Sequence, residues 1–337
     1  MNKKVGYAIA LAAALAAPFV VYPVFLMKIL CFALFACAFN LLIGFTGLLS
    51  FGHAAFFGGA GYIAGHALKV WGWPVELGLA AGVVVAAVIG LVMGALAIRR
   101  QGIYFTMITL ALAQMLFFVF LQAPFTGGED GLQGVPRGSL LGLIDLGSDM
   151  TLYYVVLGVF IGGFALIVRT VHSPFGQVLK AIKENEPRAI SLGYDVDKYK
   201  LLAFVLSGAL AGLAGATKTL VLGFETLTDV HWSMSGLVVL MTLVGGLGTL
   251  SGPIVGAIVI IALENKLGEF GSVLADLTSI EWFRSIGESV TIVTGFIFIV
   301  CVLAFRRGIV GELVEFGKRR KPASTPVAAP ALKTVEG

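Results

Sequence analysis

The sequence predicts an all-α integral membrane protein with about ten transmembrane helices. Of its 337 residues, 58% are hydrophobic and only 12% are charged, and the mean hydropathy is +0.97. Many of its apolar runs approach the roughly 20 residues that a helix needs to cross a bilayer. The 44 glycines fit closely packed membrane helices, because small residues let two helix backbones approach each other. This composition excludes an ordinary soluble domain.

Ten apolar segments are candidate spans, and two of them are short. The segments 53–69 and 252–266 fall below the usual length, so either one is a candidate for a broken or re-entrant helix. The ten candidates are residues 6–27, 29–48, 53–69, 77–98, 103–123, 151–168, 201–222, 233–249, 252–266 and 285–305.

The distribution of positive charge predicts the orientation of these spans. If the N-terminus lies inside, 17 Lys and Arg residues fall in cytoplasmic segments and five fall in outside segments. Because cytoplasmic loops carry the excess of Lys and Arg, we expect both termini in the cytoplasm.

The N-terminus also has some features of a signal peptide, because Lys3 and Lys4 precede an apolar run. That run continues through Met27, which is longer than a typical signal core, so we interpret it as a retained first helix. The predicted organisation is a transmembrane permease domain over 1–316, with an ordered outer loop at 124–150, followed by a disordered cytoplasmic tail at 317–337.

No motif indicates an enzyme, a metal site or a cofactor site. The three cysteines, Cys31, Cys37 and Cys301, lie in apolar runs and are interpreted as small hydrophobic residues. The four histidines lack metal-ligand spacing, and no nucleophile motif or acidic metal pair is present. Nothing indicates a nucleic-acid partner. We therefore expect a translocation protein embedded in membrane lipid.

A polar, basic segment at 169–200 interrupts the apolar sequence. Its middle predicts one short helix, because Asn185 and Glu186 suit the cap, Pro187 suits the first turn and Gly193 suits the stop. A helix of about six residues is roughly 9 Å long, too short to span a membrane. It suits a knob that docks into a groove of a soluble partner.

Two glycine-rich interruptions, at 44–53 and 245–253, predict broken helices that line a pathway. Non-helical backbone at membrane depth is tolerated where protein or a water-filled cavity satisfies it. The alternative is an ordinary turn with glycines for packing. The residues interpreted as possibly pathway-lining are Asn40, Thr46, Gly47, Ser50, His53, Gly245, Gly246, Thr249 and Ser251.

Lys218 is an ionisable group within a predicted span, which is a functional feature by default. Because it lies about three-quarters of the way along its span, we favour a side chain that extends to the outer interface.

Several stretches, in order, resemble the M-type membrane subunits of branched-chain amino acid ABC importers over about residues 30 to 316. They are GLLSFGHAAFFGGAGY (47–62), GIYFTMITLALAQM (102–115), TGGEDGL (126–132), SPFGQVLKAIKENEPRAISLGYDVDKYKLLAFVLSGALAGLAGA (173–216), HWSMSG (231–236), GGLGTLSGP (245–253) and RRGIVG (306–311).

This resemblance implies a permease subunit in the bacterial inner membrane that forms half of a translocation pathway. Its implied partners are a related H-type permease subunit, two cytoplasmic ATPases that hydrolyse ATP, and a periplasmic substrate-binding protein. The segment 181–193 matches the family's coupling segment. The glutamate-alanine-alanine signature of many importers is not literally present, and Glu186, Ala189 and Gly193 match it only loosely. The expected coupling residues are Lys180, Ala181, Ile182, Lys183, Glu184, Asn185, Glu186, Pro187, Arg188, Ala189, Ile190 and Gly193.

Within this segment, we expect Ile182 and Ile190 to fill a cleft of the ATPase, and Lys180, Lys183 and Arg188 to orient it. The implied substrates are Leu, Ile and Val. Urea, short amides and other amino acids are alternatives within the same architecture. More distant alternatives are a self-contained secondary transporter, which predicts intramembrane acids and gives the knob no role, and a channel or structural membrane subunit.

Overall fold

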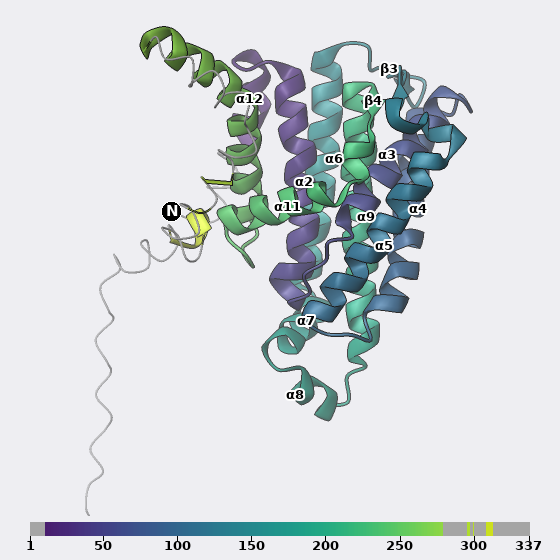
Figure 1. The fold of residues 1–337 in the computed structure, drawn as a ribbon, viewed down its shortest axis with the longest axis vertical. Coiled ribbons are helices and arrows are strands. Elements are labelled where there is room, and N and C mark those ends of the chain that lie inside the picture. Colours follow the sequence, from purple (N-terminus) through teal and green to yellow (C-terminus); the bar gives the residue numbers. More distant parts are fainter. Residues whose placement is uncertain (1–10, 279–294, 297–298, 300–307, 313–337) are drawn as a thin grey trace, which may run out of the picture.

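The structure is a computed structural model that describes residues 11–278, 295–296, 299 and 308–312 (Figure 1). The predicted last span, 285–305, lies almost entirely outside this part, and so does the predicted tail. Side-chain positions in the helix that ends at Thr278 are described as far as residue 265.

The described chain is predominantly helical. Five helices are long and apolar enough to cross a membrane: α2 (Pro23–Thr46), α4 (Val75–Ala97), α5 (Ile103–Gln122), α6 (Asp149–His172) and α9 (Val196–Leu222). The other helices are η1 (Ala17–Phe19), α3 (His53–Lys69), η2 (Pro124–Thr126), η3 (Gly128–Asp130), α7 (Pro174–Glu184), α8 (Glu186–Ser191), α10 (Leu227–Val230), α11 (Trp232–Gly245) and α12 (Gly252–Thr278). These elements make the chain an all-α membrane protein.

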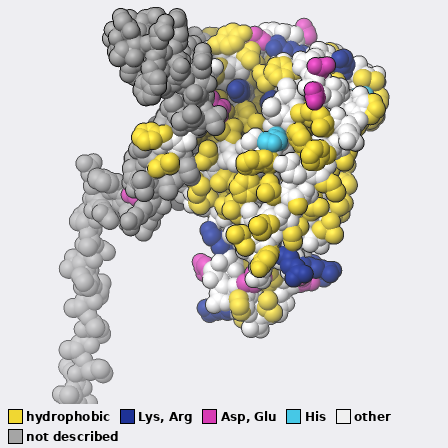
Figure 2. All heavy atoms as spheres, viewed as in Figure 1, with side chains coloured by type: hydrophobic (Ala, Val, Ile, Leu, Met, Phe, Trp, Pro, Cys, Tyr) yellow, Lys and Arg dark blue, Asp and Glu magenta, His cyan; other side chains and the backbone are white. Residues whose placement is uncertain are grey.

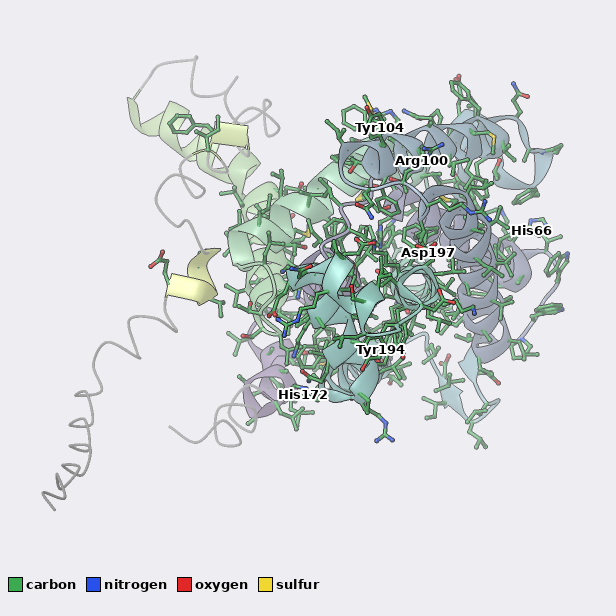
Figure 3. The ribbon with its side chains drawn as sticks, turned by 90° about the horizontal axis from the view of Figure 1, so that it is seen from below. His66, Arg100, Tyr104, His172, Tyr194 and Asp197 are labelled. Carbon is green, nitrogen blue, oxygen red and sulfur yellow. The ribbon has the colours of Figure 1, made fainter. Side chains whose placement is uncertain are left out.

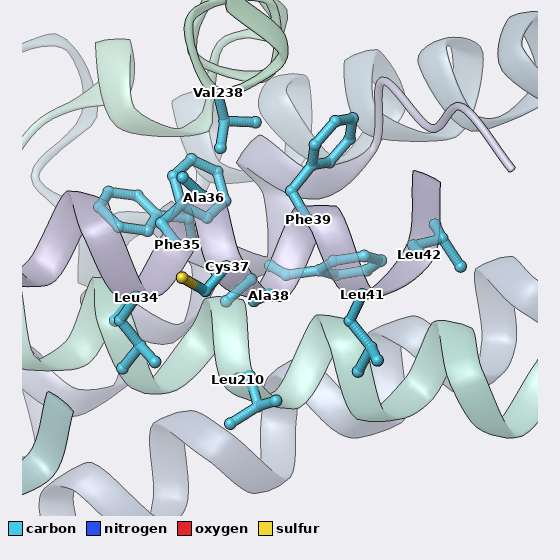
Figure 4. Packing of buried hydrophobic residues seen from close by; sticks show 14 of the residues in the cluster. Leu34, Phe35, Ala36, Cys37, Ala38, Phe39, Leu41, Leu42, Leu210 and Val238 are labelled. Carbon is cyan, nitrogen blue, oxygen red and sulfur yellow. The ribbon is translucent and has the colours of Figure 1, made fainter. Parts of the chain in front are cut away.

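Helix α2 occupies the centre of the bundle and packs against α6, α9, α11 and α12 (Figure 1). In its most apolar stretch, 78% of residues are buried, against 22% in α5. Its side chains meet Leu210 of α9 and Val238 of α11 in the apolar core (Figure 4). The outward faces of α4 and α5 remain apolar and exposed, which suits contact with lipid (Figure 2).

The described part of the first predicted span is not one continuous helix. Residues 11–16 are helical and lead into η1, residues 20–22 are not helical, and α2 starts at Pro23. Proline suits the first turn of a helix because its missing N–H would have no partner there. The second span therefore begins six residues earlier than the predicted residue 29.

Helix α11 corrects the prediction of a span over 233–249. It has 14 residues, which is about 21 Å of helix and short of the roughly 30 Å of a bilayer core. It also runs across α2 instead of alongside it (Figures 1 and 4). By contrast, α12 continues to Thr278 and is longer than the predicted 252–266.

The bundle has two distinct ends. Helices α7 and α8 project from one end, here called the knob end, which Figure 3 shows from below with Tyr194 and His172 on it. At the other end, here called the sheet end, strand β1 (Leu132–Gln133) pairs with β4 (Phe224–Glu225), and β2 (Ser139–Leu140) pairs with β3 (Ile144–Asp145). Arg137 bonds Asp149 there at 2.6 Å, which ties the 124–150 loop to the start of α6.

Candidate functional site

Helix α8 forms where its local signals predict it. The Asn185 side chain accepts a hydrogen bond from the backbone N–H of Arg188 at 3.0 Å, and Pro187 lies in the first turn. Gly193 follows the helix with φ of +86°, a left-handed conformation that favours glycine. Helix α7, which precedes it, was not predicted as a separate element. The sequence feature that could have indicated the start of α7 is Ser173 directly before Pro174. The Ser173 side chain caps the helix by accepting a hydrogen bond from the backbone N–H of Gly176.

The α7–α8 knob, residues 174–193, has a small apolar core of its own. Ile182, Ala189 and Val196 are buried together, and Phe175 stacks on Tyr199 with ring centroids 5.5 Å apart. The Ile182 side chain is 3% exposed. This placement corrects the expectation that Ile182 fills a partner's cleft, because its side chain fills the interior of the knob.

The tip of the knob exposes apolar side chains to solvent. Ile190 is 57% exposed, Leu192 is 67% exposed and Tyr194 is 40% exposed. Arg188 is also exposed beside them. Ile190 and Arg188 are therefore accessible to solvent, and Leu192 and Tyr194 extend the same surface, here called the tip surface. Leu192 and Tyr194 were not predicted, although their apolar side chains stand out in an otherwise polar sequence.

Ionic and polar contacts join the knob to the helix bundle. Glu186 accepts hydrogen bonds from Lys200 of α9 at 2.6 Å and from Gln101, between α4 and α5, at 2.9 Å. On α7, Lys183 donates to the backbone oxygen of Gly44 at 2.7 Å, and the Lys180 ammonium lies 5.8 Å from the centre of the Phe45 ring. Lys180 and Lys183 thus contact α2 of their own chain, so they join the knob to the bundle and, unlike Arg188, do not belong to the tip surface.

The interruption at 44–53 places non-helical backbone inside the bundle. Gly47 ends α2 with φ of +79°, and α3 begins at His53. The His53 ring bonds the Ser207 hydroxyl at 2.9 Å, and Ser207 donates to the Ala38 oxygen at 2.6 Å. Ala38 and Ser207 lie in the middle portions of α2 and α9, so α3 starts well inside the bundle.

Side chains of α5 and α11 form hydrogen bonds with the backbone of residues 47–52. Thr109 accepts from the N–H of Phe51 at 3.3 Å, and Thr106 donates to the Leu49 oxygen at 2.9 Å. Ser235 of α11 donates to the Phe51 oxygen at 2.8 Å. Thr46 bonds back to α2, and Ser50 bonds the N–H of Gly52. Protein side chains therefore satisfy part of this non-helical backbone, which is what tolerates it at membrane depth.

The second interruption forms a tight turn at residues 246–251 near the knob end. Gly246 and Gly248 have φ of +122° and +72°. Thr249 donates to the Gly246 oxygen at 2.8 Å and accepts from the N–H of Gly252 at 3.1 Å. Gly245 packs so closely on α12 that a Cβ atom there would lie 1.9 Å from the Gly252 oxygen. Ser251 is exposed.

Lys218 does not extend to the interface as we had favoured, because it is the centre of a buried ionic cluster. Its side chain is 5% exposed, and its ammonium lies 3.2 Å from a carboxylate oxygen of Glu225 and 2.5 Å from one of Asp229. Thr219 donates to Glu225, and Thr226 donates to Asp229. Two opposite charges within reach explain why Lys218 stays buried.

Glu225 and Asp229 were missed from the sequence. The sequence feature that could have indicated these two carboxylates is their distance along the chain. They follow Lys218 by seven and eleven residues, in the segment after α9. Glu225 belongs to β4, which pairs with β1, so the cluster also fixes the 124–150 loop onto the bundle.

Comparison with known proteins identifies the family of this chain independently of its structure. Residues 23–306 match the family described as branched-chain amino acid transport system / permease component. The chain is 26% identical over 254 residues to the high-affinity branched-chain amino acid transport system permease protein LivM of Escherichia coli, an alignment that covers 68% of this chain and 60% of LivM. The alignment thus spans about three-fifths of that relative's length.

Permeases named for other cargo are also similar to the chain. It is 30% identical over 154 residues to the autoinducer 2 import system permease protein LsrC of Klebsiella pneumoniae, covering 42% of each chain. It is 30% identical over 174 residues to the ribose import permease protein RbsC of Bacillus subtilis, covering 49% of this chain and 51% of RbsC. Because the family match extends from the start of α2 to beyond α12, the chain belongs to the family of branched-chain amino acid transport system permease components.

Proposed function

We propose that this chain is a permease subunit of an ATP-driven importer and forms half of a translocation pathway for branched-chain amino acids. The observation that carries this proposal is the α7–α8 knob, which combines an exposed apolar tip with direct bonds to α2 and α9. A surface of this kind suits a soluble partner that moves the helices to which the knob is joined.

The proposed assembly places the knob end in the bacterial cytoplasm, where two ATPase subunits bind, and the sheet end in the periplasm. A related H-type permease subunit completes the pathway, and a periplasmic binding protein delivers the substrate. Both chain termini are cytoplasmic in this arrangement, in agreement with the excess of Lys and Arg on that side. Residues 47–53 and 245–251 are the proposed pathway-lining elements.

The proposed mechanism is alternating access. ATP binding closes the two ATPases, and the knob passes that motion to the spans, so that the pathway changes the side to which it opens. We expect Ile190 and Leu192 to supply most of the affinity for the ATPase, because buried apolar anchors dominate interfaces. Arg188 is expected to orient the partner, since a single exposed ion pair contributes only about 0–1 kcal/mol.

Charge at the tip surface is therefore expected to release the ATPase. Ile190→Asp and Leu192→Asp should each weaken its binding by about 2 kcal/mol, or roughly 30-fold, as the loss of an interface anchor does. The measurement is co-purification of the ATPase with tagged permease in mild detergent, with mass spectrometry of the bound subunits. The matched control is Leu143→Asp, which places the same charge at an 86% exposed leucine near the sheet end.

Two results would contradict this proposal. One is that the tip variants retain the ATPase as well as the control does. The other is that the purified chain moves a solute in liposomes without ATP, which would indicate a secondary transporter. Competition of leucine uptake by isoleucine, valine, urea and ribose then identifies the substrate class, because relatives of the chain include a ribose permease by name.

A further inference from the structure

Three segments that are far apart in the sequence meet at the knob end of α2. They are α7, the last turns of α2, and the 246–251 turn that joins α11 to α12. The contacts among them run through two side chains, Asn40 of α2 and Lys183 of α7.

Asn40 binds the 246–251 turn with both ends of its amide. Its Nδ2 donates to the Thr249 oxygen at 2.8 Å, and its Oδ1 accepts from the N–H of Gly248 at 3.0 Å. The side chain is 2% exposed, so no water replaces these bonds if the turn moves away. A buried polar group without partners costs about 1–3 kcal/mol, so α2 and this turn are expected to move together.

Gly44 makes this close approach possible. A Cβ atom at Gly44 would lie 2.3 Å from Oδ1 of Asn40 and 2.9 Å from the backbone nitrogen of Gly248. Only a residue without a side chain therefore lets the turn reach Asn40 in this geometry.

Lys183 attaches α7 to the same point. Its ammonium donates to the Gly44 oxygen at 2.7 Å, and that oxygen belongs to the last turn of α2, where carbonyl groups lack partners within the helix. A cation at this end of a helix is also favoured by the helix dipole. A Cβ atom added at Gly248 would lie 4.0 Å from the Lys183 amino group, so the 246–251 turn is also near this side chain.

We propose that Lys183 and Asn40 form a transmission link from the knob to helices α11 and α12. A displacement of α7 passes through Lys183 to the end of α2, and through Asn40 to the 246–251 turn. Both are positioning residues, since they act on the turn through backbone groups. This inference rests on the proposed function, because it needs an ATPase to move the knob.

The test follows the position of the turn and needs no transported substrate. Ser251, an exposed residue at the end of the turn, is changed to cysteine in the assembled transporter. The rate of maleimide labelling is then compared with and without ATP and vanadate, which trap the closed ATPases. The chain with Ser251 intact supplies the background from native cysteines.

We expect nucleotide trapping to change the labelling rate of Ser251→Cys by about fivefold or more, the lower end of ordinary coupling between sites. In Lys183→Met, which keeps the aliphatic stem and loses the bond to Gly44, this change should disappear while ATP hydrolysis and ATPase co-purification persist. Lys183→Arg should restore it in part. Asn40→Ala should have the same effect as Lys183→Met, and the exposed Lys183 tests the link even if Asn40→Ala lowers the yield of folded protein.

The control is Lys198→Met, because Lys198 is an exposed lysine at the same end whose ion-pair partner is Asp195. A nucleotide-dependent change that survives Lys183→Met would overturn the link, and so would the absence of any change in an assembly that hydrolyses ATP. If no ATPase co-purifies with the unmodified chain, the proposed function itself fails.

Discussion

Lys218→Met is expected to lower the free energy of unfolding by about 3–5 kcal/mol, the usual cost of removing one partner from a buried ion pair. The substitution keeps much of the side-chain volume but leaves Glu225 and Asp229 without their cation. The Glu225 and Asp229 side chains are 0% and 6% exposed, so water does not compensate for the loss. The measurement is the thermal midpoint of the purified protein in detergent, followed by the fraction that stays monodisperse.

A variant that removes all three charges distinguishes charge burial from packing. Lys218→Met combined with Glu225→Gln and Asp229→Asn should recover most of the lost stability, because no uncompensated charge remains. Lys198→Met is the matched control on the same helix. Its pair with Asp195 is 80% and 51% exposed, and exposed pairs contribute about 0–1 kcal/mol. Equal losses in Lys218→Met and Lys198→Met would refute the buried cluster.

Gly215→Ala is expected to cost about 3 kcal/mol, at the upper end of ordinary overpacking. A Cβ atom at this position of α9 would lie 1.9 Å from the backbone oxygen of Phe57 in α3. Because the obstacle is backbone and not a flexible side chain, α3 and α9 must separate to admit the methyl group. The loss should be visible as a lower thermal midpoint and a lower yield of folded protein.

Gly162→Ala in α6 is the matched control. A Cβ atom there meets nothing within 4 Å, and the position is exposed. Alanine is also a better helix former than glycine by about 1 kcal/mol in water, so this variant should be unchanged or slightly more stable. If both glycine variants have the same thermal midpoint and the same yield, the close approach of α3 and α9 is wrong.

The features that local sequence predicted well are those that local chemistry decides. Asn185, Pro187 and Gly193 specify α8 through a cap, a first turn and a stop, all within nine residues. The long apolar helices follow from composition, because a bilayer-spanning segment needs little more than about 20 apolar residues. The glycine-rich interruptions at 44–53 and 245–253 were also visible, because glycine and polar residues break an apolar pattern.

The features that were missed depend on contacts between distant segments. Hydropathy treats 233–249 as a span, yet α11 has 14 residues and crosses α2. Ile182 and Ile190 look equivalent in a short amphipathic segment. The fold buries Ile182 against Val196 of α9 and leaves Ile190 exposed.

The sequence by itself determined that this chain is a helical membrane protein whose apolar spans are interrupted by a short polar helix, since apolar runs and helix-end signals act over one or two turns of helix. Only the tertiary structure decided which polar groups meet. Lys218 forms ion pairs with Glu225 and Asp229, which lie beyond the end of its helix. Asn40 forms a hydrogen bond with a turn 208 residues away in the sequence. The physical reason is that a buried polar group must be satisfied by some partner, but its residue type does not say which segment of the chain the fold will bring to it.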